Sequence, residues 1–264
     1  VNSATFSANA LNIGTGGLAV ATTAGDITQG GKFVVAGAVS FDAGTHAVTL
    51  NNGSNDFQGT VSATGAGVSL ADANNLNVIA LTDNNNGNVN LTAGGMLTLP
   101  ASGINAGTGN LTLASDGGAL TSSGTLSGSN VSLSGSAGLV LNSNVTAAGT
   151  LTLTSSNAAI DQTGGILMAN TLTGSAAGSV TLNGANLIGN LGTFTAAGFS
   201  LTNNQALTVS SGATVDGGTS MALTTTTGDL TIDGTVKGTA TTLKSAGAIS
   251  EGVGGSITAG TLTG

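Results

Sequence analysis

Residues 199–232 read FSLTNNQALTVSSGATVDGGTSMALTTTTGDLTI, and this stretch decides the fold. Four triplets, each an apolar residue, a small residue and a second apolar residue, begin at positions 199, 207, 221 and 230. In a β-strand, successive side chains point to opposite faces, so the two apolar residues of each triplet share one face. The pattern therefore predicts short strands with one buried face.

The same triplet recurs along most of the chain, and its spacing predicts how the strands are arranged. Triplet ends at 201, 209, 223 and 232 are separated by 8, 14 and 9 residues, so a short and a long step together span about 21 residues. One complete turn of a β-helix, here called a coil, needs about this many residues. We therefore predict an all-β fold, a right-handed parallel β-helix (β-solenoid) of about 12–13 coils of roughly 21 residues. The other triplets start at Val48, Val68, Leu76, Val89, Leu97, Leu111, Val131, Leu151 and Val180.

A longer repeat overlies the coils. The stretch AGDITQGG at 24–31 recurs as AAIDQTGG at 158–165, again as AGAISEG at 246–252, and more weakly near Leu120. These recurrences predict one continuous β-helix over 1–264, divided into modules at about 24–117, 118–157 and 158–246, with the next beginning at 247–264.

The apolar residues are mostly Ala, Val, Leu and Ile, which suits a narrow core. The composition also argues against several functions. Charged residues make up 5% of the chain and the net charge is −8, with only three lysines and no arginine. Nucleic-acid binding requires clustered basic residues, so we expect no nucleic-acid partner. Apolar runs are too short to span a bilayer, so we do not expect a membrane-spanning protein. Cysteine is absent, which excludes disulfides and thiolate metal sites.

The sequence offers no convincing constellation for catalysis or metal binding. The closest acidic pair, Asp229 and Asp233, flanks a predicted strand, and both residues are interpreted as turn residues beside glycine. His46 is the only histidine, and a single histidine cannot build a histidine-based metal site or a triad alone. We therefore predict that the chain is not an enzyme and has no catalytic, cofactor-binding or metal-ligating residues and no cofactor.

The stretches GDLTIDGTVKG at 228–238, LKSAGAISEGVGGSITAGTLTG at 243–264 and AAGFSLTNNQALTV at 196–209 carry a family resemblance. They resemble repeats of filamentous-haemagglutinin-like exoproteins, the large secreted partners of two-partner secretion systems in Gram-negative bacteria. The resemblance covers essentially the whole chain, and we interpret the chain as part of a longer protein. It implies a β-helix shaft, an outer-membrane secretion pore as partner, and a role in adhesion or biofilm matrix.

The leading hypothesis is thus the structural shaft of a secreted, surface-displayed bacterial adhesin or extracellular matrix fibre. Its expected partners are ligands on host or neighbouring cells, or matrix glycans. Two alternatives stay open at this point. One is a homopolymeric extracellular filament formed by end-to-end stacking through open β edges, and the other is a β-helix whose polar face itself binds glycans.

Overall fold

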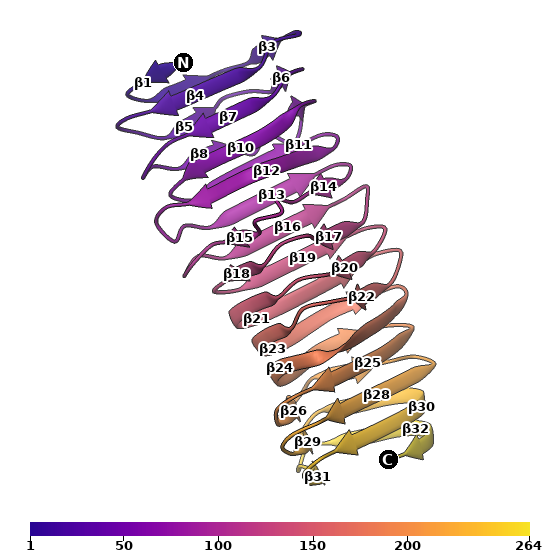
Figure 1. Ribbon diagram of the computed structural model, residues 1–264. Helices are drawn as coiled ribbons and strands as arrows, with labels where there is room; N and C mark the ends of the chain where they lie inside the picture. The colour runs from indigo at the N-terminus through magenta and orange to yellow at the C-terminus, as the bar shows by residue number, and fades with distance from the viewer. The chain divides into compact units, whose positions relative to one another are not determined.

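The computed structural model describes residues 1–264 and is built entirely from strands, all paired in parallel, with no helix. It forms a β-solenoid of about 12 coils with roughly 21 residues per coil, which confirms the predicted fold class. The chain comprises two compact units, Val1–Gly135 and Ser136–Gly264, and each is a stack of coils in its own right (Figure 1). No helix is present that is long and apolar enough to cross a membrane.

The first unit contains nineteen short strands. They are β1 (Asn2–Ser3), β2 (Phe6–Ala8), β3 (Leu11–Ile13), β4 (Leu18–Thr22), β5 (Ile27–Gln29), β6 (Phe33–Val35), β7 (Val39–Asp42), β8 (Val48–Leu50), β9 (Asp56–Phe57), β10 (Thr60–Gly65), β11 (Val68–Asp72), β12 (Leu76–Asp83), β13 (Val89–Ala93), β14 (Leu97–Thr98), β15 (Ile104–Asn105), β16 (Leu111–Ser115), β17 (Leu120–Ser122), β18 (Leu126–Gly128) and β19 (Val131–Gly135).

The second unit contains thirteen strands, several of them longer because they continue around a corner. They are β20 (Leu139–Leu141), β21 (Val145–Ser155), β22 (Ile160–Gln162), β23 (Leu167–Ala176), β24 (Ser179–Thr195), β25 (Gly198–Asn203), β26 (Leu207–Val209), β27 (Thr214–Asp216), β28 (Ser220–Thr225), β29 (Leu230–Ile232), β30 (Thr235–Ser245), β31 (Ile249–Glu251) and β32 (Ser256–Thr263).

Parallel pairing between equivalent strands of successive coils sets the period in each unit. In the first unit one column runs β2, β5, β8, β11, β13, β16 and β19, and paired residues are 20 to 22 positions apart. In the second unit β27, β30 and β32 pair at intervals of 21 residues. Because most strands have a partner on each side, most of their backbone hydrogen-bonding groups are satisfied without helices.

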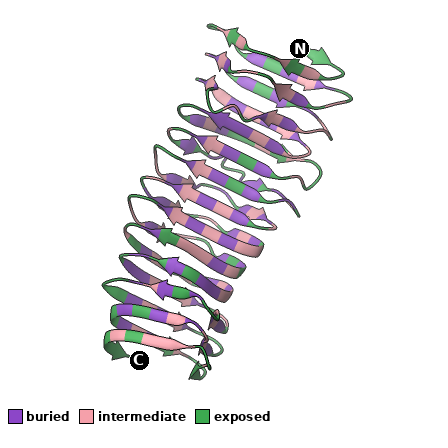
Figure 2. Ribbon diagram, turned by 180° about the vertical axis from the view of Figure 1, so that it is seen from behind, coloured by how far each residue is buried: buried purple, intermediate pink, exposed green.

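The core follows the triplets. Both apolar residues of every predicted triplet are buried, and every middle residue is half-buried or exposed. Figure 2 shows this alternation along the strands of each unit, with buried segments separated by intermediate and exposed ones. The buried side chains are mostly Leu, Val, Ile and Ala, with five phenylalanines among the largest. This confirms the predicted narrow aliphatic core.

Glycine allows successive coils to approach closely at the corners. A Cβ added at Gly37 would lie 2.7 Å from the carbonyl carbon of Gly16, and one added at Gly59 would lie 2.4 Å from the carbonyl carbon of Gly37. Real Cβ atoms do not approach backbone so closely, so these three positions form a glycine column in which each backbone rests directly on the next.

Candidate functional site

Each residue that sequence reasoning considered for chemistry lies beside a strand or in a turn. Asp229 directly precedes β29 and Asp233 lies in the bend that follows it, and Asp229 Oδ1 accepts a hydrogen bond of 2.8 Å from the Ala248 backbone N–H in the following coil. His46 lies in a turn, where its backbone N–H donates to the Ala43 carbonyl at 2.9 Å. No group of three or more His, Cys, Asp or Glu side chains could hold a metal ion.

The ion pair of the chain joins two neighbouring coils at the surface. Lys237 Nζ donates to Asp216 Oδ2 at 2.8 Å, and these two residues stand opposite each other on β30 and β27. The hydrogen bond from Lys237 lowers the pKa of the Asp216 carboxyl below its usual value. Because the lysine side chain is largely exposed, this pair contributes little to stability.

The most elaborate polar site of the first unit is a pair of side-chain amides, of which the glutamine is half-buried and the asparagine is buried. Gln29 Nε2 donates to Asn55 Oδ1 at 2.8 Å, and Asn55 Nδ2 donates back to Gln29 Oε1 at 3.0 Å. Asn55 is fully buried, its Oδ1 also accepts from the Phe33 N–H, and its Nδ2 also donates to the Leu50 and Ala71 carbonyls. A single asparagine thus bonds to backbone groups of three strands, β6, β8 and β11. We call this Gln–Asn pair an amide clasp.

The second unit contains the same arrangement. Gln162 Nε2 donates to Asn186 Oδ1 at 2.8 Å, and Asn186 Nδ2 donates back to Gln162 Oε1 at 2.9 Å. The fully buried Asn186 again accepts from one backbone N–H, that of Leu167, and donates to two carbonyls, those of Leu182 and Thr202. The two clasps match bond for bond.

The clasps define a long repeat within the chain. Gln29 and Gln162 are 133 residues apart, and Asn55 and Asn186 are 131 apart. Both glutamines fall in the AGDITQGG-like stretches in which the sequence shows its longer repeat, whereas the asparagines lie a coil later and were not singled out. The predicted module boundaries stay a prediction. What the clasp does chemically is to satisfy buried backbone groups at a corner, which is a structural role.

A second buried polar position differs between the units. In the first unit Asp72 Oδ2 accepts the Phe57 N–H at 2.6 Å, and in the second Asn203 Oδ1 accepts the Ile188 N–H at 2.8 Å. Phe57 and Ile188 each lie two residues beyond the clasp asparagine, so the two sites are equivalent. Burial raises the pKa of the Asp72 carboxyl, although hydrogen bonds from backbone N–H groups partly oppose this effect. In the second unit the neutral Asn203 makes the same contact with the backbone.

The difference in stability between the Asp72→Asn variant and the wild type is expected to shift in favour of the variant as the pH rises above the carboxyl's usual range. A carboxyl whose folded-state pKa is raised contributes most to stability below its unfolded-state pKa of 3.8, and this contribution is lost as pH rises through the folded-state value. The neutral amide removes that loss and keeps an oxygen acceptor for Phe57. It cannot also accept the bond that Asp72 Oδ1 receives from the Asn74 N–H, so the pH dependence rather than the absolute stability is compared. Urea unfolding at several pH values between about 3 and 7 measures the difference.

The control is the exposed Asp42→Asn substitution in the same unit, measured over the same pH range. Equal pH dependence of the Asp72→Asn variant and the wild type would contradict the assignment of the raised pKa to this buried carboxyl.

Hydroxyl and amide groups form ladders on the outer surface. Thr152 and Thr173 hydroxyls lie 3.2 Å apart on adjacent coils of the second unit, and Asn130 Nδ2 donates to Asn110 Oδ1 at 3.0 Å in the first. Such ladders connect coils through neutral polar groups that also face solvent.

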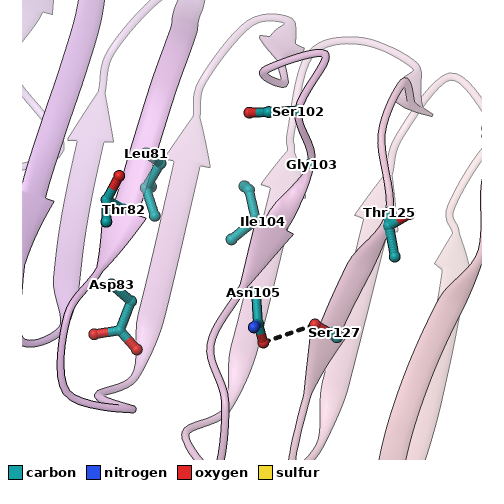
Figure 3. A pocket seen from close by; sticks show the side chains of 9 residues that line it. All are labelled: Leu81, Thr82, Asp83, Ser102, Gly103, Ile104, Asn105, Thr125 and Ser127. Atoms are coloured by element: carbon teal, nitrogen blue, oxygen red, sulfur yellow. Dashed lines mark hydrogen bonds between the residues drawn. The ribbon is translucent and has the colours of Figure 1, made fainter.

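A surface concavity with a volume of about 540 Å3 lies in the first unit, beside β12, β15 and β18. We call it the β12–β15 groove. Figure 3 shows Leu81, Thr82 and Asp83 on one wall and Ile104 and Asn105 on the other. The groove is within the size range of ligand pockets, and nothing in the triplet pattern predicted it.

Comparison with known proteins gives one family match. Residues 1–64 and 128–191, just under half of the chain, match a family described as "Repeats of unknown function" (DUF5649). The first matched segment contains the Gln29–Asn55 clasp and the second the Gln162–Asn186 clasp. No curated protein and no solved structure matches the chain significantly.

Proposed function

We propose that this chain is a structural repeat region of a secreted, surface-displayed bacterial adhesin or extracellular matrix fibre, without catalytic activity of its own. The observation that carries the proposal is the in-register parallel pairing within each unit, which repeats one coil design with an aliphatic inside and a polar outside. Each coil contacts mainly its neighbours, so such an architecture gains extent by adding coils. A shaft requires length, and added coils supply it.

The surface is consistent with an extracellular role. Only 5% of residues are charged, and the outer faces carry neutral Thr, Ser and Asn side chains that satisfy one another in ladders. The family resemblance of the sequence points the same way, to secretion through an outer-membrane pore and to ligands on other cells or matrix glycans.

Immunogold labelling of intact cells with antibodies raised against residues 1–264 tests the proposal. Gold particles are expected on the surface of unpermeabilised cells or on extracellular material, because a shaft must be displayed outside the cell. Antibodies to a cytoplasmic protein of the same cells serve as the control for membrane integrity. Labelling that appears only after permeabilisation would overturn the extracellular assignment.

A further inference from the structure

The β12–β15 groove marks an interruption in a parallel ladder. On one side, β12 pairs with β10 along residues 60–65. On the other side only Leu76 and Asn77 are paired, with β14, and the rest of β12 has no strand partner there. The groove is therefore bordered by a free strand edge inside a stack of coils.

The only proline of the chain accounts for the interruption. Pro100 has no N–H to donate to a ladder, and it follows directly after β14 and Leu99. Its carbonyl accepts the Gly103 N–H at 2.9 Å, which closes a tight turn in which Gly103 has a φ of 83°. The chain then pairs with the following coil, since the Ile104 N–H donates to the Thr125 carbonyl at 2.9 Å. The segment is thus bonded to the coil after it, and the edge of β12 is left open.

Peptide groups of β12 face this opening. The Asn84 N–H donates to the Gly65 carbonyl of β10 at 2.8 Å, and peptide groups in a strand alternate in direction. The N–H and C=O groups of Leu81 and Asp83 therefore point away from β10, toward the groove. At other ladder interruptions in this unit a side chain takes the free N–H group: Asp72 accepts from Phe57, and Ser115 Oγ accepts from Leu97 at 3.1 Å. No side chain does so for Leu81 or Asp83.

Two side chains at the same edge also lack partners that their neighbours have. Leu81 stands in register with the buried Ala63 and, through it, with the buried Phe41, yet it is only half-buried. Asp83 Oδ1 accepts the Gly67 N–H at 2.9 Å, but Asp83 Oδ2 is buried without any hydrogen-bond partner. A half-buried apolar side chain and a carboxylate oxygen without a hydrogen-bond partner thus lie beside a free strand edge (Figure 3).

We propose that the β12–β15 groove binds an extended, positively charged polypeptide segment by strand addition. The backbone of the segment bonds to the peptide groups of Leu81 and Asp83, an apolar side chain covers Leu81, and a Lys or Arg two residues further pairs with Asp83. The net charge of −8 favours a cationic partner. This inference stands independently of the proposed extracellular function.

Fluorescence anisotropy with labelled octapeptides tests the proposal on the full chain. The probe carries valine and lysine two positions apart in a threonine background. One control peptide has glutamate in place of lysine, and another has proline in place of the threonines that flank the valine, which removes backbone N–H donors. Saturable binding is expected for the probe alone, and hydrogen exchange should show that the probe protects residues 81 and 83.

Protein variants identify the site. Asp83→Asn should weaken binding about tenfold or more, whereas Asp42→Asn, an exposed aspartate at the end of β7, should leave it unchanged. Leu81→Ala should also weaken binding, and circular dichroism checks that each variant is folded. Absence of saturable binding, equal binding by Asp83→Asn, or a groove that binds neutral oligosaccharides but not the probe would overturn the proposal.

Discussion

Replacing Asn186 with alanine is expected to lower the free energy of unfolding by about 3–5 kcal/mol. The substitution leaves the Leu167 N–H and the Leu182 and Thr202 carbonyls without their side-chain partner in a buried corner, and it removes both bonds to Gln162. Each buried polar group left unsatisfied costs about 1–3 kcal/mol. Urea unfolding followed by far-UV circular dichroism is the suitable measurement, because the chain has no Trp or Tyr.

Asn183 provides a matched control three residues away. It is exposed, and its Oδ1 accepts one bond of 2.8 Å from the Ser200 hydroxyl, so Asn183→Ala should change stability by less than about 0.5 kcal/mol. Asn55→Ala should repeat the large loss in the first unit, where the clasp is the same. A small effect at both clasp asparagines would show that water replaces the clasp at little cost.

Replacing Phe194 with alanine is expected to have a similarly large effect, a loss of about 3–5 kcal/mol. Phe194 is fully buried in the second unit, and its ring centroid lies 4.9 Å from that of Phe199. Gly174 makes room for it: a Cβ at that position would lie 2.9 Å from the Phe194 ring. Removal of the ring therefore leaves a cavity beside a residue that has no side chain to fill it.

The same unfolding measurement with Phe194→Leu separates cavity formation from the loss of aromatic contact. Leucine keeps most of the apolar volume, so the loss should fall to about 1.5 kcal/mol or less. If both substitutions had equal effects, the ring–ring contact rather than the cavity would dominate.

The sequence predicted the fold because its strongest pattern is also the main physical determinant. Triplets such as Leu111-Thr112-Leu113 place two apolar residues inward, and spacing of about 21 residues leaves stacked coils as the arrangement that pairs them. The third strand of a coil can be too short to leave a clear pattern in the sequence. β15, for example, contains only Ile104 and Asn105, too short for any alternation to appear.

The polar sites depend on contacts that a single sequence does not reveal. Asn55 and Asn186 are two among 26 asparagines, and nothing local distinguishes a buried corner asparagine from a solvated one. Their glutamine partners are 26 and 24 residues away, which becomes meaningful only once the register between coils is known. The groove likewise arises because most of β12 has no strand partner on one side. The sequence shows a single proline, Pro100, but its effect on a strand one coil earlier depends on the pairing between coils.

The regular pairing between coils, with about 21 residues between most partners, also has a consequence for how genes of this kind can change length. If one whole coil is lost or duplicated, each remaining residue still pairs with an equivalent residue in the adjacent coil. A shift by a single residue would instead turn the apolar side chains of a strand outward. The glycine column formed by Gly16, Gly37 and Gly59 imposes the same rule on the corners. Recombination is therefore expected to lengthen or shorten such chains in steps of about 21 codons.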